Sequence, residues 1–272
     1  MYPSNGTSLP QLAIKRQQPI HRRNRTMGKK KVAAASAAKA KTRKGNSYAR
    51  REVAAWEADE VPAALRFEPQ SQSLRVRHLH DELIYDVPSF LSRAECQRVR
   101  AFADHEGFER VTQRASREFA FRDNDRLLLR LPAFAELLWK RLQPHVPAEY
   151  EGMHAAGLNP AIRFYRYNAG QRFGCHVDQS DVDRVTGFHS RFTVLVYLND
   201  AKDSDLQGGN TIFYANEAGA KEEHVVLSVA PETGAALIHG HGDRCLLHEG
   251  ALVTRGAKYL LRTDVMYSRI KR

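Results

Sequence analysis

The sequence predicts an α+β protein in which two helices precede, and pack on, a β-sandwich or jelly roll of short strands. Two apolar repeats with helical spacing, one starting at Ser92 and one at 133–143, predict the helices. The chain after residue 160 is rich in Val, Ile, Phe, Tyr and Thr, with Gly, Asn and Asp between the runs, which predicts the sheet. The expected strands are 161–167, 191–198, 211–214, 223–229, 235–239, 244–248 and 257–267.

Charge divides the chain unevenly. Residues 1–51 hold 14 of the 42 Lys and Arg and no Asp or Glu, so 52–272 hold the other 28 (42 − 14) against 31 acids. High charge with low hydrophobicity predicts a disordered basic tail, because such a segment buries too little surface to offset chain entropy. We therefore divide the chain into a tail at 1–51, lead-in strands and supporting helices at 52–156, and a jelly-roll core at 157–272.

The location of the protein is predicted from what the sequence lacks. No stretch approaches the roughly 18 apolar residues that a membrane span needs, and the N-terminus has no apolar secretory core. We expect no membrane association and residence in the cytoplasm or nucleus. The acid-free tail also suits a mitochondrial presequence, so the mitochondrion is the alternative. A third role for residues 1–51 is contact with nucleic acid through phosphates.

The elements before residue 160 carry local signals of their own. The segment 74–91 alternates apolar and polar residues and predicts one or two strands. Ser92 with Glu95 forms a capping box, and helical spacing continues to about residue 105. The helix at 133–143 ends before two prolines. The polar run between the helices, FRDNDR at 121–126, is expected to be a charged loop, or alternatively a lid over the barrel mouth.

A metal centre is predicted from His176, Asp178 and His248. In a strand, side chains at i and i+2 project to the same face, so His176 and Asp178 can both reach one ion. The third ligand must come from a neighbouring strand, and His248 is well placed to supply it. Two imidazoles and one carboxylate leave three metal positions open, the pattern of non-haem Fe(II) oxygenases. His239 and His241 form a second pair, in a Gly-rich stretch expected to be a loop with solvent-facing or supporting roles.

Lys258 is the candidate for binding an anionic cosubstrate. It lies ten residues after His248, at the start of the last long strand, and Gly250 and Gly256 supply a turn between them. A strand returning past the metal would place the ammonium inside the barrel, facing a dicarboxylate's far end. Arg262 shares strand parity with Lys258, so it should point inward too and contact an acid such as Asp178, or the substrate.

The C-terminal half resembles the catalytic domain of prolyl 4-hydroxylase-like 2-oxoglutarate/Fe(II) dioxygenases. The resemblance is carried by four blocks in the family's order: RFYRYNAGQRFGCHVD (163–178), RFTVLVYLND (191–200), GGNTIFY (208–214) and LLHEGALVTRGAKYLLRTD (246–264). It implies a double-stranded β-helix as the jelly-roll core. Phe173 departs from the pattern, because many members have a tyrosine at that position.

The resemblance also implies roles for single residues. His176, Asp178 and His248 would bind Fe(II), and Lys258 would bind the distal carboxylate of 2-oxoglutarate. Tyr167 falls where the family has a tyrosine near the cosubstrate. Three further residues are candidates for contacts with 2-oxoglutarate. One is Arg262, and the others are Thr193 and Tyr197, which lie on the same face of one predicted strand and could both point into the barrel.

The reaction implied is hydroxylation of a C–H bond, with 2-oxoglutarate and O2 consumed and ascorbate as reductant. A prolyl or other residue in a protein is the first choice of substrate. The enzymatic alternative is a nucleic-acid demethylase, which the basic tail favours, although the arginine-rich block after the distal histidine is missing. From another class, the chain could be a non-catalytic metal-binding jelly roll with an RNA-binding tail.

Overall fold

The computed structural model describes residues 60–67, 73–82, 84–215 and 224–269. The basic tail predicted at 1–51, with its alternative roles, lies outside the described residues. In the part of the chain that is described, no helix combines the length and apolarity that a membrane span requires.

The two α-helices confirm the sequence-based prediction. Helix α1 (Arg93–Glu106) begins after Ser92, whose hydroxyl accepts from the Glu95 amide at 3.2 Å, while the Glu95 carboxylate accepts from the Ser92 amide at 2.8 Å. This reciprocal pair is the predicted capping box. Helix α2 (Pro132–Leu142) begins on a proline, whose missing N–H costs nothing at a helix start. The short 3-10 helices are η1 (Ala63–Leu65), η2 (Gln143–His145) and η3 (Gly242–Arg244).

Within the described residues, the strands form one antiparallel sheet of fourteen strands and a separate pair. The main path of the sheet runs β1-β2-β13-β9-β16-β7-β4-β8-β14-β11-β12. The bounds are β1 (Arg77–His80), β2 (Ile84–Val87), β3 (Glu109–Gln113), β4 (Arg122–Arg130), β5 (Glu149–Tyr150), β6 (Met153–Leu158), β7 (Ala161–Asn168), β8 (Arg172–His176), β9 (His189–Tyr197), β11 (Thr211–Tyr214), β12 (Val225–Val229), β13 (Ala236–Gly240), β14 (Leu247–Gly250) and β16 (Ala257–Ser268), with β10 (Gln207–Gly208) and β15 (Val253–Arg255) as the separate pair.

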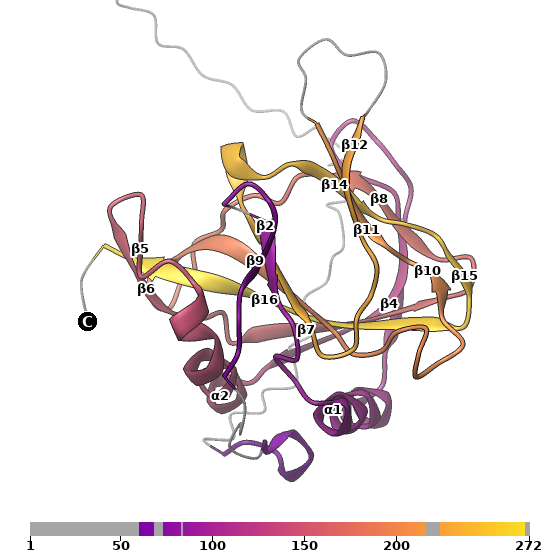
Figure 1. The fold of residues 1–272 in the computed structure, drawn as a ribbon, viewed down its shortest axis with the longest axis horizontal. Coiled ribbons are helices and arrows are strands. Elements are labelled where there is room, and N and C mark those ends of the chain that lie inside the picture. Colours follow the sequence, from indigo (N-terminus) through magenta and orange to yellow (C-terminus); the bar gives the residue numbers. More distant parts are fainter. Residues whose placement is uncertain (1–59, 68–72, 83, 216–223, 270–272) are drawn as a thin grey trace, which may run out of the picture. The chain divides into compact units, whose positions relative to one another are not determined.

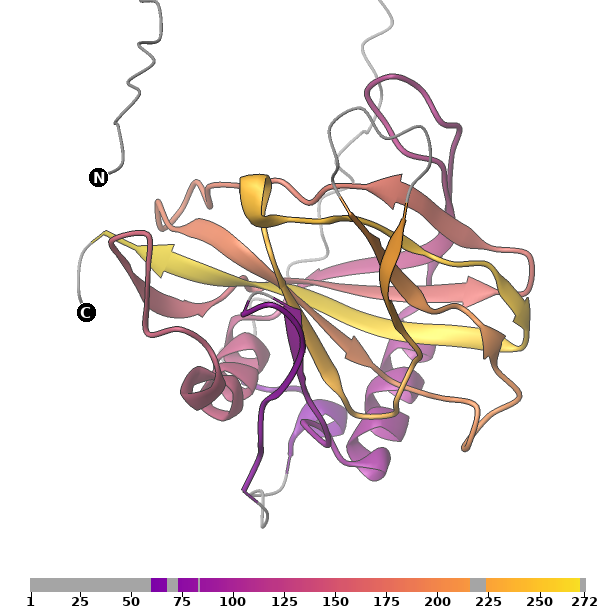
Figure 2. The ribbon, with the colours of Figure 1, turned by 45° about the horizontal axis from the view of Figure 1, so that its top comes forward.

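The sheet curls into a nearly closed barrel, and both α-helices lie against its outer face (Figure 1). Strand alternation separates two apolar cores. In β9, Val194 and Val196 join the helices in the outer core, whereas Leu195 and Tyr197 belong to the inner one. Figure 2 shows β16 crossing the middle of this arrangement. The fold is therefore the predicted jelly roll, with the helices packed on one sheet face.

Strands from before residue 157 take part in the same sheet as the core. Strand β2 pairs with β13, and β4 pairs with both β7 and β8. The prediction of a loop or lid at 121–126 is wrong, because all but its first residue lies in β4. The run is charged and not apolar, and one of its acids, Asp125, accepts from Arg166 of β7 at 2.9 Å, so no apolar alternation marked the strand.

Candidate active site

The predicted metal ligands converge at one end of the barrel interior. His176 is the last residue of β8, Asp178 follows it, and His248 lies in β14 directly opposite His176 in the strand register. The Nε2 atoms of His176 and His248 each lie 3.8 Å from a carboxylate oxygen of Asp178. The potential ligand atoms of these residues all lie within 4.8 Å of one another. One strand pairing therefore joins residues that are 72 positions apart in the sequence.

Both imidazoles are held in the tautomer that suits metal binding. The Nδ1 atom of His176 lies 2.9 Å from the Gly174 carbonyl oxygen, and that of His248 lies 2.9 Å from the Leu246 carbonyl oxygen. A carbonyl only accepts, so each Nδ1 carries the hydrogen and each Nε2 presents a lone pair. Burial, together with the neighbouring His248, lowers the pKa of His176 to about 3. The rings are neutral and fit a divalent cation.

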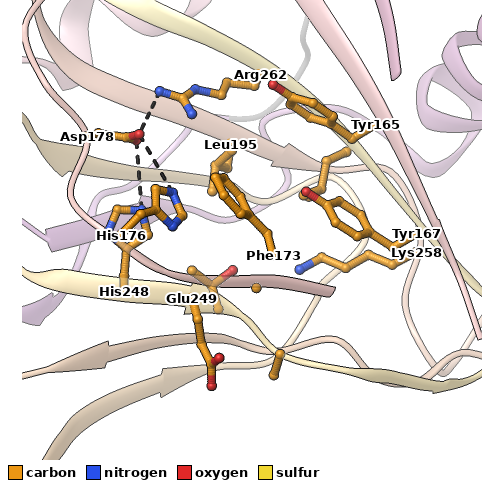
Figure 3. A pocket seen from close by; sticks show the side chains of 14 residues that line it. Tyr165, Tyr167, Phe173, His176, Asp178, Leu195, His248, Glu249, Lys258 and Arg262 are labelled. Atoms are coloured by element: carbon orange, nitrogen blue, oxygen red, sulfur yellow. Dashed lines mark ion pairs between the residues drawn. The ribbon is translucent and has the colours of Figure 1, made fainter. Parts of the chain in front are cut away.

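Asp178 is oriented by two donors that share one of its oxygens. Its Oδ2 lies 3.0 Å from Arg262 Nη2 and accepts from the Thr193 hydroxyl at 2.8 Å. Burial alone would raise the pKa of Asp178, but the Arg262 guanidinium and the nearby imidazoles hold it well below its usual range. The carboxylate is ionised, and its Oδ1 lies 3.8 Å from His176 Nε2, whereas Oδ2 lies 3.8 Å from His248 Nε2. Strand parity with Lys258 predicted that Arg262 would point inward, and it does (Figure 3).

Thr193 connects this carboxylate to His241 and Arg262. Its oxygen lies 2.7 Å from His241 Nε2 and accepts from Arg262 at 3.1 Å. A hydroxyl has one hydrogen, and Thr193 gives it to Asp178, so His241 Nε2 must donate. Thr193 thus positions a metal ligand, a contact that differs from the cosubstrate contact predicted for it.

His239 and His241 are buried, so the prediction of solvent-facing loop residues is wrong. His239 is 1% exposed within β13, and His241 is 7% exposed just after it. The supporting role predicted as the alternative does describe His241. His239 Nε2 lies 3.8 Å from Asp178 Oδ2 and has no hydrogen-bond partner among the described residues.

His239 also belongs to a second group that could hold a metal, together with Cys245 and His248. Cys245 Sγ lies 3.9 Å from His239 Nδ1 and 3.7 Å from His248 Nδ1. Both contacts use Nδ1, and that atom of His248 is occupied by the Leu246 carbonyl. The group of His176, Asp178 and His248 has its lone pairs available, so it is the better site for a metal.

His176, Asp178 and His248 line a pocket in the barrel interior, and Lys258 lines the same pocket. Lys258 lies at the opposite side of this pocket from the three predicted ligands (Figure 3). It is 2% exposed, and its ammonium donates to the Gly209 carbonyl. The ammonium also lies 5.3 Å from the centre of the Tyr197 ring. Burial lowers the pKa of Lys258 to about 7. No acidic side chain of the described residues forms an ion pair with it, so a dianionic ligand would complete its charge balance.

The remaining predicted residues differ in how close they come to the pocket. Tyr167 is opposite Lys258 in the register of β7 and β16 and lines the pocket. Tyr197 faces the interior as its parity predicted, and its hydroxyl lies 2.8 Å from that of Thr211. Tyr197 and Thr193 are not among the lining residues, because Leu195 on the same strand face lies between them and reaches the pocket.

Sequence reasoning missed several lining residues. Strand parity could have identified three of them, since Tyr165 lies on the same strand face as Tyr167, Leu195 on that of Thr193 and Tyr197, and Leu260 on that of Lys258. Thr211 and Glu249 carried no such signal, because each depends on which strand pairs with which. Those omitted from the prediction are Tyr165, Leu195, Thr211, Glu249, Gly250, Ala251 and Leu260.

Comparison with known proteins found one matching family and several similar solved structures. Residues 162–263 match the family described as the 2OG-Fe(II) oxygenase superfamily. Similar solved structures include a viral collagen prolyl hydroxylase from Paramecium Bursaria Chlorella virus-1 (18% identity, 69% of this chain and 98% of that chain, TM-score 0.46). A second is a prolyl-4-hydroxylase from Pseudomonas putida (16% identity, 67% of this chain and 91% of that chain, TM-score 0.43). A third is a prolyl hydroxylase from Trichoplax adhaerens in complex with a hypoxia inducible factor peptide fragment (16% identity, 68% of this chain and 84% of that chain, TM-score 0.46). No curated protein matches the sequence.

Proposed function

We propose that this chain, whose residues 162–263 match the 2OG-Fe(II) oxygenase superfamily, hydroxylates a prolyl or other residue of a protein. One observation carries the proposal: two neutral histidines, one ionised carboxylate and a buried lysine share a single pocket. Such a cluster leaves open positions on iron, and the lysine suits the far carboxylate of 2-oxoglutarate.

The residues of the pocket have separable tasks. His176, Asp178 and His248 would hold Fe(II), while Arg262 and Thr193 keep Asp178 in place. Iron, O2 and 2-oxoglutarate together would supply the oxidation that hydroxylates a C–H bond, with succinate and carbon dioxide as the other products. Apolar side chains that line the pocket would limit the access of water to the iron; these are Phe173, Leu195 and Leu260.

The substrate class is supported by the resemblance of the sequence blocks 163–178 and 246–264 to prolyl 4-hydroxylase-like enzymes. Ascorbate as reductant follows from the same resemblance. We also infer residence in the cytoplasm or nucleus, with the mitochondrion as the alternative. The charge of residues 1–51 supports either an import signal or a contact with nucleic acid.

Mass spectrometry of cellular proteins tests the substrate class. Cells that express the wild-type chain should contain peptides heavier by one oxygen atom that are absent with Asp178→Ala. The matched control is Asp205→Ala, because that carboxylate is 63% exposed and lies outside the pocket. The proposal is supported if the heavier peptides occur with the wild-type chain and with Asp205→Ala but not with Asp178→Ala. Modified nucleic acid in place of modified peptide would contradict it.

A further inference from the structure

Two arginine–phenylalanine stacks lie side by side where β4 meets β8. The Arg122 guanidinium lies 3.8 Å from the centre of the Phe173 ring, and the Arg172 guanidinium lies 5.2 Å from that of Phe121. Arg122 is directly opposite Phe173 in the strand register. Strand β4 supplies Arg122, β8 supplies Arg172 and Phe173, and Phe121 directly precedes β4, so both guanidinium groups are carried by paired strands.

These stacks adjoin the pocket. Phe173 lines it and stacks on the imidazole of His176, with ring centres 3.7 Å apart. The Arg122 guanidinium is thus separated from a metal ligand by one phenyl ring. A group bound by this arginine would lie close to the pocket in which a substrate C–H bond must be placed.

The arginines at this place lack acidic partners. No carboxylate of the described residues forms an ion pair with Arg122 or Arg172. The neighbouring acid, Asp123, accepts from Nε and Nη2 of Arg110 at 2.8 and 2.9 Å, so it is already paired with another arginine. Arg114 and Arg117, both exposed on the segment between β3 and β4, add further positive charge, and no carboxylate of the described residues pairs with either.

We propose that this rim, defined as Arg114, Arg117, Arg122 and Arg172, binds acidic side chains that flank the hydroxylated residue of a protein substrate. The inference rests on the proposed function and deepens it. A guanidinium stacked on a ring keeps its planar N–H edge available, and this edge binds a carboxylate through two parallel hydrogen bonds. Acidic residues near the target residue would then position it over the pocket.

The same charges would attract a nucleic acid, but two observations favour a peptide. Phe173, the ring nearest the pocket, stacks on the His176 imidazole and on the Arg122 guanidinium, so these groups occupy the faces on which a base would stack. The pocket is lined by no Asn or Gln, the side chains best suited to reading the edge of a base. An aliphatic side chain fits this lining better.

Fluorescence anisotropy with the full chain tests the rim directly. The probes are a labelled peptide with one proline between glutamates, the same peptide with glutamines, and a labelled oligouridylate, all at physiological ionic strength. Wild type should bind the glutamate peptide about tenfold more tightly than the glutamine peptide. Arg122→Gln and Arg172→Gln should each remove most of this preference, and Arg172→Lys should retain part of it because it keeps the charge. The control Lys140→Gln, on α2, should leave it unchanged.

The basic residues at 1–51 are present in every variant, so only the difference between variants reports on the rim. Arg172→Glu should bind the glutamate peptide more weakly than Arg172→Gln does, and urea unfolding of each variant checks that it is folded. Equal binding of the two peptides by wild type would overturn the inference, as would a preference that both glutamine variants retain. Tighter, Arg172-dependent binding of oligouridylate would assign the rim to nucleic acid. Peptide binding without any heavier peptide in cells would instead contradict the proposed function.

Discussion

The two ends of the pocket differ in whether a buried charge has an oppositely charged protein partner. At the metal end, Asp178 is 7% exposed and contacts Arg262 and Thr193 at 3.0 and 2.8 Å. At the other end, Lys258 is 2% exposed and has the Gly209 carbonyl as its acceptor, with no carboxylate. Burial accordingly lowers the pKa of Lys258 to about 7, whereas Asp178 remains fully ionised.

The two ends therefore differ in what compensates the buried charge: protein groups at the metal end, and a bound ligand at the lysine end. A buried charge is costly unless a partner compensates it. The partners of Asp178 are protein groups, so the metal end is organised before any cosubstrate binds. The partner that Lys258 lacks is supplied by a dianion, so the lysine end stabilises the bound state more than the empty one.

The largest expected effect is loss of the metal. Replacing His176, Asp178 or His248 by Ala should abolish stable Fe(II) binding, because each removes one of three ligands. Metal content after anaerobic loading and desalting measures this. Cys245→Ala should keep its iron, since the geometry favours the oxygen-containing ligand set. Iron retained by the Asp178 variant and lost by the Cys245 variant would assign the metal to the other group.

Stability of the empty protein should separate the two ends. Asp178→Ala leaves Arg262 buried beside one remaining acid, Asp264 at 3.6 Å, and should cost about 3 kcal/mol of unfolding free energy. Lys258→Met removes a cation without an acidic partner and should cost nothing or stabilise the protein. Urea unfolding of metal-free protein measures both. A Lys258 variant destabilised as much as the Asp178 variant would show that the comparison is wrong.

The pH dependence of cosubstrate binding follows from Lys258. Its protonated form attracts the dianion, and in the empty protein that form dominates below about pH 7. Above that pH the lysine is neutral and must take up a proton on binding, so the dissociation constant for 2-oxoglutarate should rise by up to about tenfold per pH unit. Calorimetry in buffers of different ionisation enthalpy detects the proton. Lys258→Met should bind weakly with no such slope.

The smallest expected effect concerns Arg262. Arg262→Ala should reduce, by about severalfold, the fraction of 2-oxoglutarate turnover that yields hydroxylated product, because Asp178 loses a donor that orients it. The ratio of succinate to hydroxylated peptide measures this coupling. Arg262→Lys should restore part of the coupling through its charge. An unchanged ratio in Arg262→Ala would leave Thr193 as the donor that matters.

Local signals made part of this structure predictable. The capping box at Ser92 involves neighbours in the chain, and alternation along one strand related Lys258 to Arg262. Features that depend on which strands pair could not be predicted from such local signals. The charged strand β4 has its partners on other strands, and Thr193 reaches Asp178 only because the barrel brings β9 beside the end of β8. The burial of His239 likewise depends on its neighbours β2 and β9.

Succinate formation by the full chain, supplied with Fe(II), ascorbate and 2-oxoglutarate, tests the central claim most directly. Wild type should form succinate. Lys258→Met should require more than tenfold more 2-oxoglutarate but recover turnover at saturation, because only the cosubstrate's far end has lost its partner. Asp178→Ala should form none at any concentration. Undiminished turnover by an Asp178→Ala protein that still binds iron would contradict the assignment of this pocket.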